Sequence, residues 1–131
     1  MMSGKTTPSA SSIALLEEFM QAWNAHDLDS LMALMTDDCV FYASSGPEPT
    51  GTVHRGPALV RDAYAEIFKV FPDAQWKYGS HVVANGRAFS EWTFTGSRAD
   101  GHRVETRGCD LFVLRDGKIV VKDSFRKNVT S

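Results

Sequence analysis

The sequence predicts an α+β domain in which helices come early in the chain and a curved, mostly antiparallel sheet comes late. Apolar residues recur at helical spacing in the first half and alternate with period two after Pro72. The second half also contains the dipeptides Asn85-Gly86 and Asp116-Gly117. These dipeptides are the strongest short-range signal for a two-residue type I′ hairpin turn. Helical segments followed by a run of hairpins are typical of the α+β class.

Three helices are expected in the first half of the chain. Residues 13–25 carry an amphipathic apolar stripe. Asp27 is a good N-cap for a second, short helix that carries Met35 and ends at Thr36-Asp37-Asp38. Gly56-Pro57 opens a third helix, with proline at its first position, and Pro72 stops that helix.

Five strands are expected around these helices. Residues 39–42 read as a first strand, and the composition of residues 44–52 indicates a loop. Residues 76–84 and 87–95 form one hairpin around Asn85-Gly86, and residues 103–127 form a second hairpin around Asp116-Gly117.

Length and composition fit one domain. The chain has 131 residues, of which 43% are hydrophobic, so it can build a core. We expect a disordered leader over residues 1–11 and a single domain over residues 12–128. Lys and Arg number 14 against 16 Asp and Glu, with no basic block, so neither nucleic acid nor a membrane surface is an expected partner. Two cysteines, Cys39 and Cys109, are too few for a disulfide framework, and a cytoplasmic location is expected.

The second hairpin is predicted to place two carboxylates opposite each other. If Asp116-Gly117 forms the turn, Leu114 faces Ile119, and Asp110 faces Asp123 on the same apolar side. Two carboxylates in contact there cannot both ionise cheaply, so one would hold a proton and the pair would supply an acid and a base. Two alternatives remain. A bulge could shift the register and turn Asp123 outward, or either carboxylate could serve only as a structural hydrogen-bond acceptor.

Aromatic side chains are expected to line a pocket near these carboxylates, although plain core packing is the alternative for each of them. His54, in the loop before the third helix, is a further acid/base candidate at the mouth. The histidines and cysteines show no metal spacing, so no metal is expected. The predicted substrate-binding residues are Phe19, Trp23, Tyr42, Trp92, Phe112 and Phe125.

The opposite face of the second hairpin is apolar at one end and basic at the other. Three bulky apolar side chains together favour a subunit interface, so we expect a homodimer through the outer face of the sheet. An acidic ligand on the basic end is the alternative. The predicted members of this face are Arg107, Cys109, Leu111, Val113, Val120, Lys122, Ser124 and Arg126.

The order of elements and several motifs resemble the nuclear transport factor 2-like superfamily. The motifs are the segment WNAHDLD at residues 23–29, the pair Asp37-Asp38, residues 51–57, and the segment DGKIV at residues 116–120. Within this superfamily the chain is similar to the SnoaL-like proteins related to ketosteroid isomerase. The resemblance covers about residues 12–127. It implies a cone, in which a curved sheet wraps around three helices and leaves an apolar pocket at the wide end.

The resemblance also implies that ketosteroid isomerase chemistry itself is missing. The oxyanion-hole tyrosine of those enzymes matches Phe19, and their catalytic aspartate matches Ala43. Their second oxyanion donor, a protonated aspartic acid, matches Asp110. The chain is also similar to limonene epoxide hydrolases, which use two aspartates bridged by an arginine, but Arg107 is expected on the face opposite to Asp110.

We therefore expect a small-molecule enzyme that binds a mostly apolar, carbonyl- or epoxide-bearing compound. It would perform cofactor-free acid/base chemistry of the isomerase, cyclase or hydrolase type, with Asp110, Asp123 and His54 as catalytic groups. The alternative is a non-catalytic ligand-binding or protein-interaction domain of the same fold. An open cavity that reaches both aspartates would favour the enzyme, and a filled cavity would favour the alternative.

Overall fold

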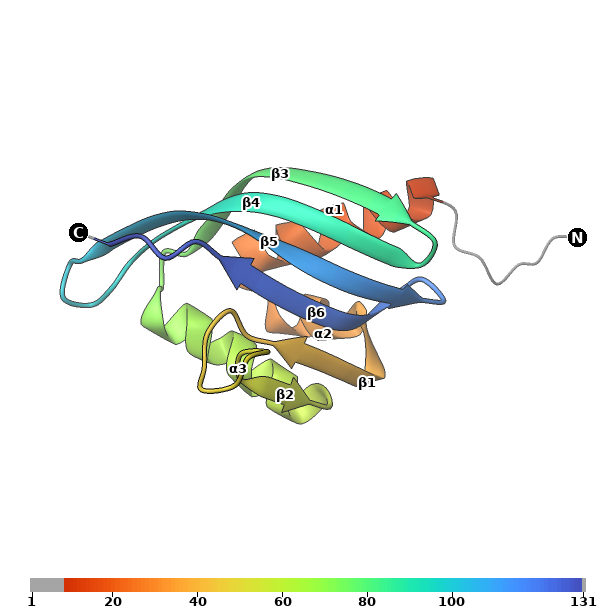
Figure 1. Ribbon diagram of the computed structural model, residues 1–131, viewed down its shortest axis with the longest axis horizontal. Coiled ribbons are helices and arrows are strands. Elements are labelled where there is room, and N and C mark those ends of the chain that lie inside the picture. Colours follow the sequence, from red (N-terminus) through yellow and green to blue (C-terminus); the bar gives the residue numbers. More distant parts are fainter. Residues whose placement is uncertain (1–8, 131) are drawn as a thin grey trace, which may run out of the picture.

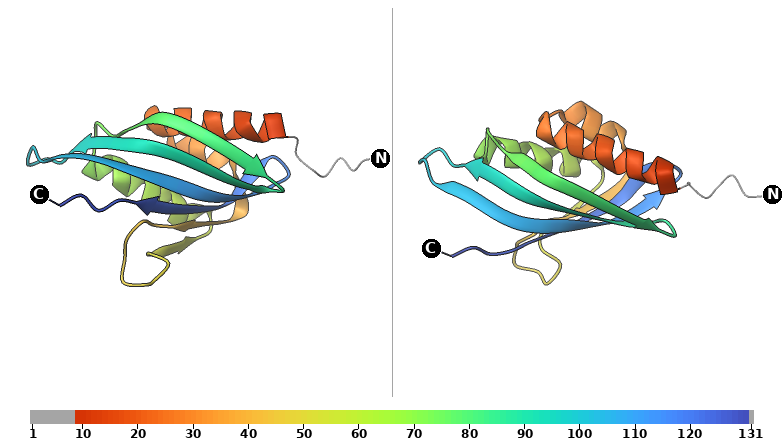
Figure 2. Two further views of the ribbon diagram at one scale, coloured as in Figure 1. Left: turned by 45° about the horizontal axis from the view of Figure 1, so that its top comes forward. Right: turned by 90° about the horizontal axis from the view of Figure 1, so that it is seen from above.

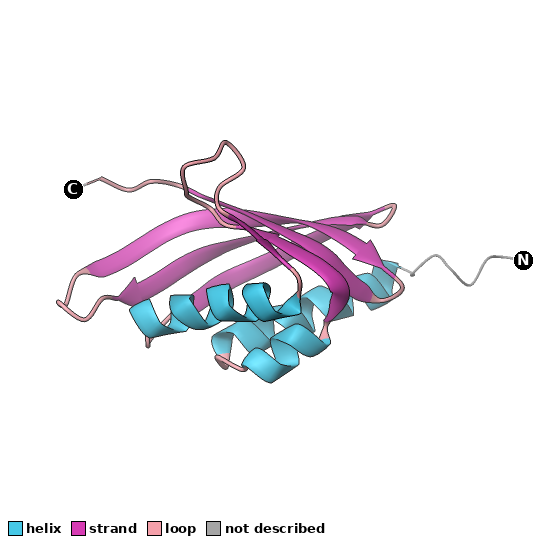
Figure 3. Ribbon diagram, turned by 90° about the horizontal axis from the view of Figure 1, so that it is seen from below, coloured by secondary structure: helices cyan, strands magenta, loops and turns pink. Residues whose placement is uncertain are grey.

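A six-stranded curved sheet covers three helices in the computed structural model, which describes residues 9–130 (Figures 1 and 3). The helices all lie on one side of the sheet, and the other side is left open (Figures 2 and 3). This arrangement confirms the predicted α+β cone. The helices are α1 (Ser9–Asn24), α2 (Leu28–Ala33) and α3 (Pro57–Val70). The strands are β1 (Met35–Tyr42), β2 (Val53–Arg55), β3 (Gln75–Ala84), β4 (Arg87–Ser97), β5 (Arg103–Arg115) and β6 (Lys118–Arg126).

The strand order in the sheet is β2-β1-β6-β5-β4-β3. The four late strands form an antiparallel meander, as expected. β1 extends the sheet by pairing in parallel with β6, and β2 pairs antiparallel with β1. The sequence did not predict β2, because a three-residue edge strand next to a polar loop has no periodicity to recognise.

Both predicted hairpin turns form. Asn85 and Gly86 have φ values of 52° and 76°, and Asp116 and Gly117 have values of 53° and 77°. Two consecutive residues with positive φ are the requirement of a type I′ turn, which Asn-Gly and Asp-Gly meet at low steric cost.

Two predicted element boundaries are wrong. α2 ends at Ala33, and Met35 already belongs to β1, which therefore begins four residues before the predicted strand. The pairing of β1 with β6 explains this difference, because the Ile119 N–H donates to the Leu34 carbonyl at 2.9 Å. α1 begins at Ser9, inside the predicted leader of residues 1–11. Residues 1–8 of that leader lie outside the described part of the chain.

The core lies between the helices and the concave face of the sheet. Tyr64 of α3 is fully buried and meets the Trp23 ring of α1 with centroids 4.5 Å apart. Leu59, at the start of α3, is 56% exposed. None of the helices within residues 9–130 is long and apolar enough to cross a membrane.

A β-bulge in β6 changes which side chains face the core. Leu114 pairs with Ile119 as predicted, but Val113 pairs with Val121, so Val120 is an extra residue in β6. Beyond the bulge Asp110 pairs with Ser124. The predicted pairing of Asp110 with Asp123 is therefore wrong. A slip of one residue reverses the face of every side chain that follows.

Candidate active site

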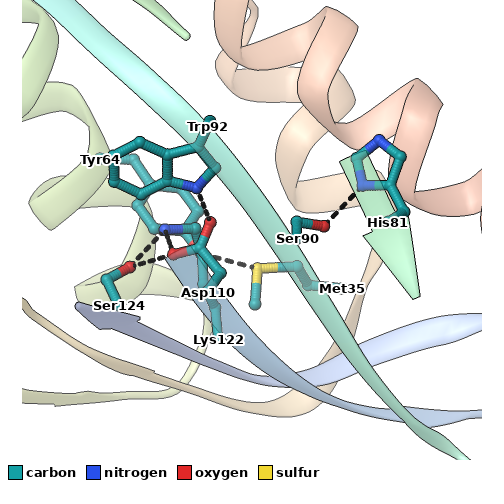
Figure 4. A network of polar contacts seen from close by, with 8 residues as sticks. All are labelled: Met35, Tyr64, His81, Ser90, Trp92, Asp110, Lys122 and Ser124. Carbon is teal, nitrogen blue, oxygen red and sulfur yellow. Dashed lines mark hydrogen bonds and ion pairs between the residues drawn. The ribbon is translucent and has the colours of Figure 1, made fainter. Parts of the chain in front are cut away.

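A polar network is buried on the concave face of the sheet, at the point where β4, β5 and β6 run side by side (Figure 4). The Lys122 Nζ lies 3.1 Å from Asp110 Oδ1 and donates to Ser124 Oγ at 2.7 Å. Ser124 in turn donates to Asp110 Oδ1 at 2.5 Å. The Trp92 Nε1–H donates to the other carboxylate oxygen, Oδ2, at 2.9 Å. The Asp110 carboxylate thus accepts three hydrogen bonds from three different side chains.

Aromatic rings surround the Lys122 ammonium on its other sides. Its Nζ lies 5.0 Å from the Trp23 ring centroid and 4.9 Å from that of Phe41. The Tyr64 centroid is 6.0 Å away. Distances of this size are typical of cation–π contacts, which are strongest where water is excluded. The side chains of Lys122 and Asp110 are only 8% and 9% exposed, so the ion pair is desolvated.

The network leaves some hydrogen-bonding capacity unused. An ammonium group has three N–H donors, and two of those of Lys122 are directed to Asp110 and Ser124. A carboxylate offers about four acceptor positions, and among residues 9–130 Asp110 Oδ2 accepts only from Trp92. One N–H of Lys122 and one lone pair of Asp110 Oδ2 therefore remain for a ligand.

A small cavity lies beside this network. Its volume is about 20 Å³, which is enough for one water molecule. Trp23 is also part of its wall, and the buried Nε1–H of this residue has no hydrogen-bond partner among the described residues. A buried unpaired donor costs about 1–3 kcal/mol, so it is a natural partner for a ligand oxygen. The cavity is lined by Leu16, Phe19, Met20, Trp23, Trp76, Ser90, Trp92, Asp110, Phe112 and Lys122.

Gly108 positions the Trp92 indole over the carboxylate. The two residues face each other on β5 and β4. A Cβ atom at Gly108 would lie 2.5 Å from the Trp92 ring and 2.5 Å from the Phe125 carbonyl oxygen. Only glycine therefore lets the indole cross β5 and direct its N–H to Asp110.

Tyr64 does not contribute a readily available proton to the site. Its hydroxyl donates to Met35 Sδ at 3.2 Å. Burial, reinforced by the negative charge of Asp110, raises the pKa of Tyr64 well above its usual value.

The structure brings together some of the predicted site residues and separates others. Asp123 faces away from the network, and burial followed by the charge of Asp110 raises its pKa. The predicted acid pair is thus replaced by the Lys122–Asp110 ion pair, because the bulge turns Lys122 inward. The predicted residues that line the cavity are Phe19, Trp23, Trp92 and Phe112.

Three further predicted site residues lie away from the cavity. Phe125 is 48% exposed on the outer face, because the bulge reverses its direction as well. His54 belongs to β2 and stacks on the Phe41 ring, with centroids 5.6 Å apart, so that ring separates it from Lys122. Tyr42, at the end of β1, is half-buried and is not part of the cavity wall.

Sequence reasoning missed Lys122 and Ser124, which it assigned to the outer face. One signal could have revealed them. The run Ile119-Val120-Val121 contains three consecutive apolar residues and so breaks the alternation of the strand, and such a break is what a bulge produces. Within residues 9–130, no three or more His, Cys, Asp or Glu side chains come together as a set of metal ligands.

Comparison with known proteins identifies the family. The family model described as a SnoaL-like domain matches residues 16–122. The chain belongs to the SnoaL-like family. This confirms the resemblance to the nuclear transport factor 2-like superfamily.

Solved structures share the fold of this SnoaL-like protein. A candidate polyketide cyclase from Xanthomonas campestris pv. campestris is 18% identical with a TM-score of 0.81, covering 92% of both chains. A nuclear transport factor 2-like protein of unknown function from Mesorhizobium loti is 25% identical with a TM-score of 0.76, covering 94% of this chain and 96% of its own. AclR, a candidate hydroxylase from Streptomyces galilaeus, is 23% identical with a TM-score of 0.74, covering 92% of this chain and 81% of its own.

Proposed function

We propose that this SnoaL-like protein is an enzyme that acts on a mostly apolar compound bearing a carbonyl or an epoxide, by acid/base chemistry without a cofactor. The observation that carries the proposal is the buried Lys122–Asp110 pair on the wall of an apolar cavity, next to the unpaired Trp23 N–H. Asp110 supplies a base, and Lys122 and Trp23 supply two donors. A carbonyl oxygen requires such donors where its negative charge develops.

The proposed step with a ketone is proton transfer from the α-carbon. Asp110 Oδ2 accepts the proton as the C–H bond breaks, and the electron pair moves into a new C=C bond. The carbonyl oxygen becomes an enolate oxygen, which accepts hydrogen bonds from Lys122 and Trp23. When the ketone carries a C=C bond between its β- and γ-carbons, return of the proton to the γ-carbon moves that double bond and completes an isomerisation. With an epoxide, Asp110 deprotonates the attacking water, the new C–O bond forms as the ring C–O bond breaks, and Lys122 gives a proton to the oxygen that leaves.

A substrate needs more room than the cavity provides. Met20 of α1 is the most adaptable side chain on its wall, because methionine is unbranched and has three rotatable bonds. Its sulfur lies against Gly79 of β3, in the space that a Cβ there would occupy. Movement of Met20 away from Gly79 would open the cavity between α1 and β3.

The test begins with a thermal-shift screen of small cyclic ketones, lactones and epoxides. For the ketones and lactones that bind, NMR then follows the exchange of their α-protons in D₂O. We expect the wild-type protein to accelerate the exchange and Asp110→Asn to slow it by about 10²–10⁴-fold. Asp123→Asn is the matched control, because Asp123 is a neighbouring carboxylate on the outer face. Equal rates for wild type and Asp110→Asn would refute the proposed base.

A non-catalytic ligand-binding or interaction domain is the second candidate function. The small volume of the cavity, about 20 Å³, favours it, because the interior is largely filled by side chains. The same screen separates the two functions. Binding without any exchange, and with the same affinity in wild type and Asp110→Asn, would support the second candidate over the enzyme.

We also propose a homodimer through the outer face of the sheet. Val82, Leu111 and Phe125 expose apolar surface there, and Phe125 lines a groove of about 360 Å³. Arg107 and Glu91 line the same groove, so a two-fold contact could pair opposite charges from two copies.

Light scattering tests the dimer. We expect a dimer at micromolar concentration and a monomer for Leu111→Glu. Leu59→Glu is the control, because Leu59 is also an exposed leucine but lies on α3. A monomeric wild-type protein at that concentration would contradict the proposed interface.

We place the protein in the cytoplasm, as the sequence suggested. Cys39 is buried and Cys109 is half-buried, and both are free thiols. Burial raises the pKa of each of them, so both favour the unreactive thiol form. Unpaired thiols fit a reducing compartment. Fractionation of the source cells would check this location.

A further inference from the structure

Four polar side chains form a continuous row across the concave face of the sheet. His81 of β3 pairs with Ser90 of β4, Ser90 pairs with Asp110 of β5, and Asp110 pairs with Ser124 of β6. The row crosses four neighbouring strands at one level. On the inner side it is flanked by apolar residues such as Phe112. Such a row is unusual on a core-facing surface, where each polar group has to be satisfied.

The row runs from a half-buried histidine to the fully buried ion pair. His81 Nδ1 lies 2.7 Å from Ser90 Oγ, and His81 stands on β3, at the edge of the sheet (Figure 4). Ser90 is only 2% exposed. Ser90, Asp110 and Lys122 all line the cavity of about 20 Å³. One water molecule fits that volume and would complete the path.

We propose that His81 and Ser90 form the route by which protons pass between solvent and the buried Lys122–Asp110 pair. This inference rests on the proposed function in one respect, since the route removes the proton that Asp110 takes from the substrate. His81 acts through Ser90 and is a relay residue, with no direct contact to the reacting atoms.

Each proton that one group on this route releases is taken up by the next group. The proton on Asp110 passes to the oxygen in the cavity, and that oxygen gives one of its own protons to Ser90 Oγ. Ser90 gives its hydroxyl proton to His81 Nδ1. The imidazolium that forms then loses its Nε2 proton to solvent, and the reverse sequence delivers a proton to the pair. His81 is left with its proton on Nδ1 in place of Nε2, and the reverse sequence restores the original tautomer.

The surroundings of His81 suit this role. Burial lowers the pKa of His81, and the negative charge of Glu17 on α1 opposes that shift. The imidazole is therefore neutral at pH 7, and its Nδ1 can accept the Ser90 proton.

The experiment measures exchange of the Lys122 ammonium protons with solvent by NMR. It needs no substrate, because Lys122 Nζ donates to Asp110 Oδ1 and can pass it a proton that then leaves along the route. His81→Gln keeps a side chain that can hydrogen-bond to Ser90 but cannot carry a proton through a ring. We expect it to slow the exchange by at least about tenfold. Ser90→Ala breaks the same route and should slow the exchange as well. His102→Gln is the matched control, because His102 is an exposed histidine in the β4–β5 loop.

Backbone amide exchange in β4 and β5 serves as the control for local opening. Unchanged Lys122 exchange in both His81→Gln and Ser90→Ala would overturn the relay. Slowed exchange in both variants, with unchanged amide protection, would support it. Absence of turnover with ketones would count against the proposed enzyme, and the Lys122 exchange rates would still test the relay. Turnover of a ketone, together with unchanged Lys122 exchange in both variants, would refute the relay and leave the proposed enzyme standing.

Discussion

Removal of the Lys122 charge should destabilise the fold more than any loss of packing would explain. In Lys122→Met the shape of the side chain is nearly kept. Asp110 retains the Ser124 and Trp92 hydrogen bonds but loses Lys122, its one cationic partner in the described part of the chain. Loss of one member of a buried ion pair costs about 3–5 kcal/mol, because the remaining charge stays desolvated. A domain of this kind has a free energy of unfolding of about 5–15 kcal/mol, so the loss is large.

The measurement is urea unfolding followed by tryptophan fluorescence, arranged as a double-mutant cycle. In Lys122→Met/Asp110→Asn no buried charge remains, and we expect at least about 2 kcal/mol of the loss to be recovered. Lys118→Met is the control, because Lys118 lies on the same strand but is exposed, and it should change stability by less than about 0.5 kcal/mol. A cost below about 1 kcal/mol for Lys122→Met, with additive effects in the double variant, would refute the reasoning.

Three further predictions concern other parts of the network and the surface. Gly108→Ala should lower the free energy of unfolding by about 1–3 kcal/mol and shift the Trp92 fluorescence, because the new Cβ displaces the indole. An unchanged emission spectrum would argue against that contact. The hydrogen bond from Arg115 lowers the pKa of Asp38 to about 2. NMR titration of Arg115→Gln should therefore show the pKa of Asp38 moving up toward 3.8. A pKa that stays near 2 would show that Arg115 is not the cause. Burial lowers the pKa of His81 below 6.5, so its contribution to stability is complete above pH 6.5 and is lost as the pH falls through the folded-state pKa. The unfolding free energy of His81→Gln should accordingly depend less on pH between 5 and 7, and identical pH profiles would contradict this.

Local chemistry in the sequence determined the elements and the turns. Asn85-Gly86 and Asp116-Gly117 form type I′ turns because these residues tolerate positive φ at low cost. Proline at the first position of α3 and the Asp27 cap of α2 likewise act within one or two turns of the chain. With the apolar periodicity, these signals were enough to predict the α+β class and to single out Asp110.

The tertiary structure alone decided which side chains meet Asp110. The bulge at Val120 forms where β6 must pair with β5 on one side and with β1 on the other, and both pairings have an irregularity there. Alternation along a strand cannot reveal a slip of one residue, yet that slip exchanges the two faces. Lys122 and Ser124 therefore point inward in place of Asp123, and an expected acid pair becomes an ion pair. The cavity and the His81–Ser90 contact depend in the same way on pairings between residues far apart in the chain.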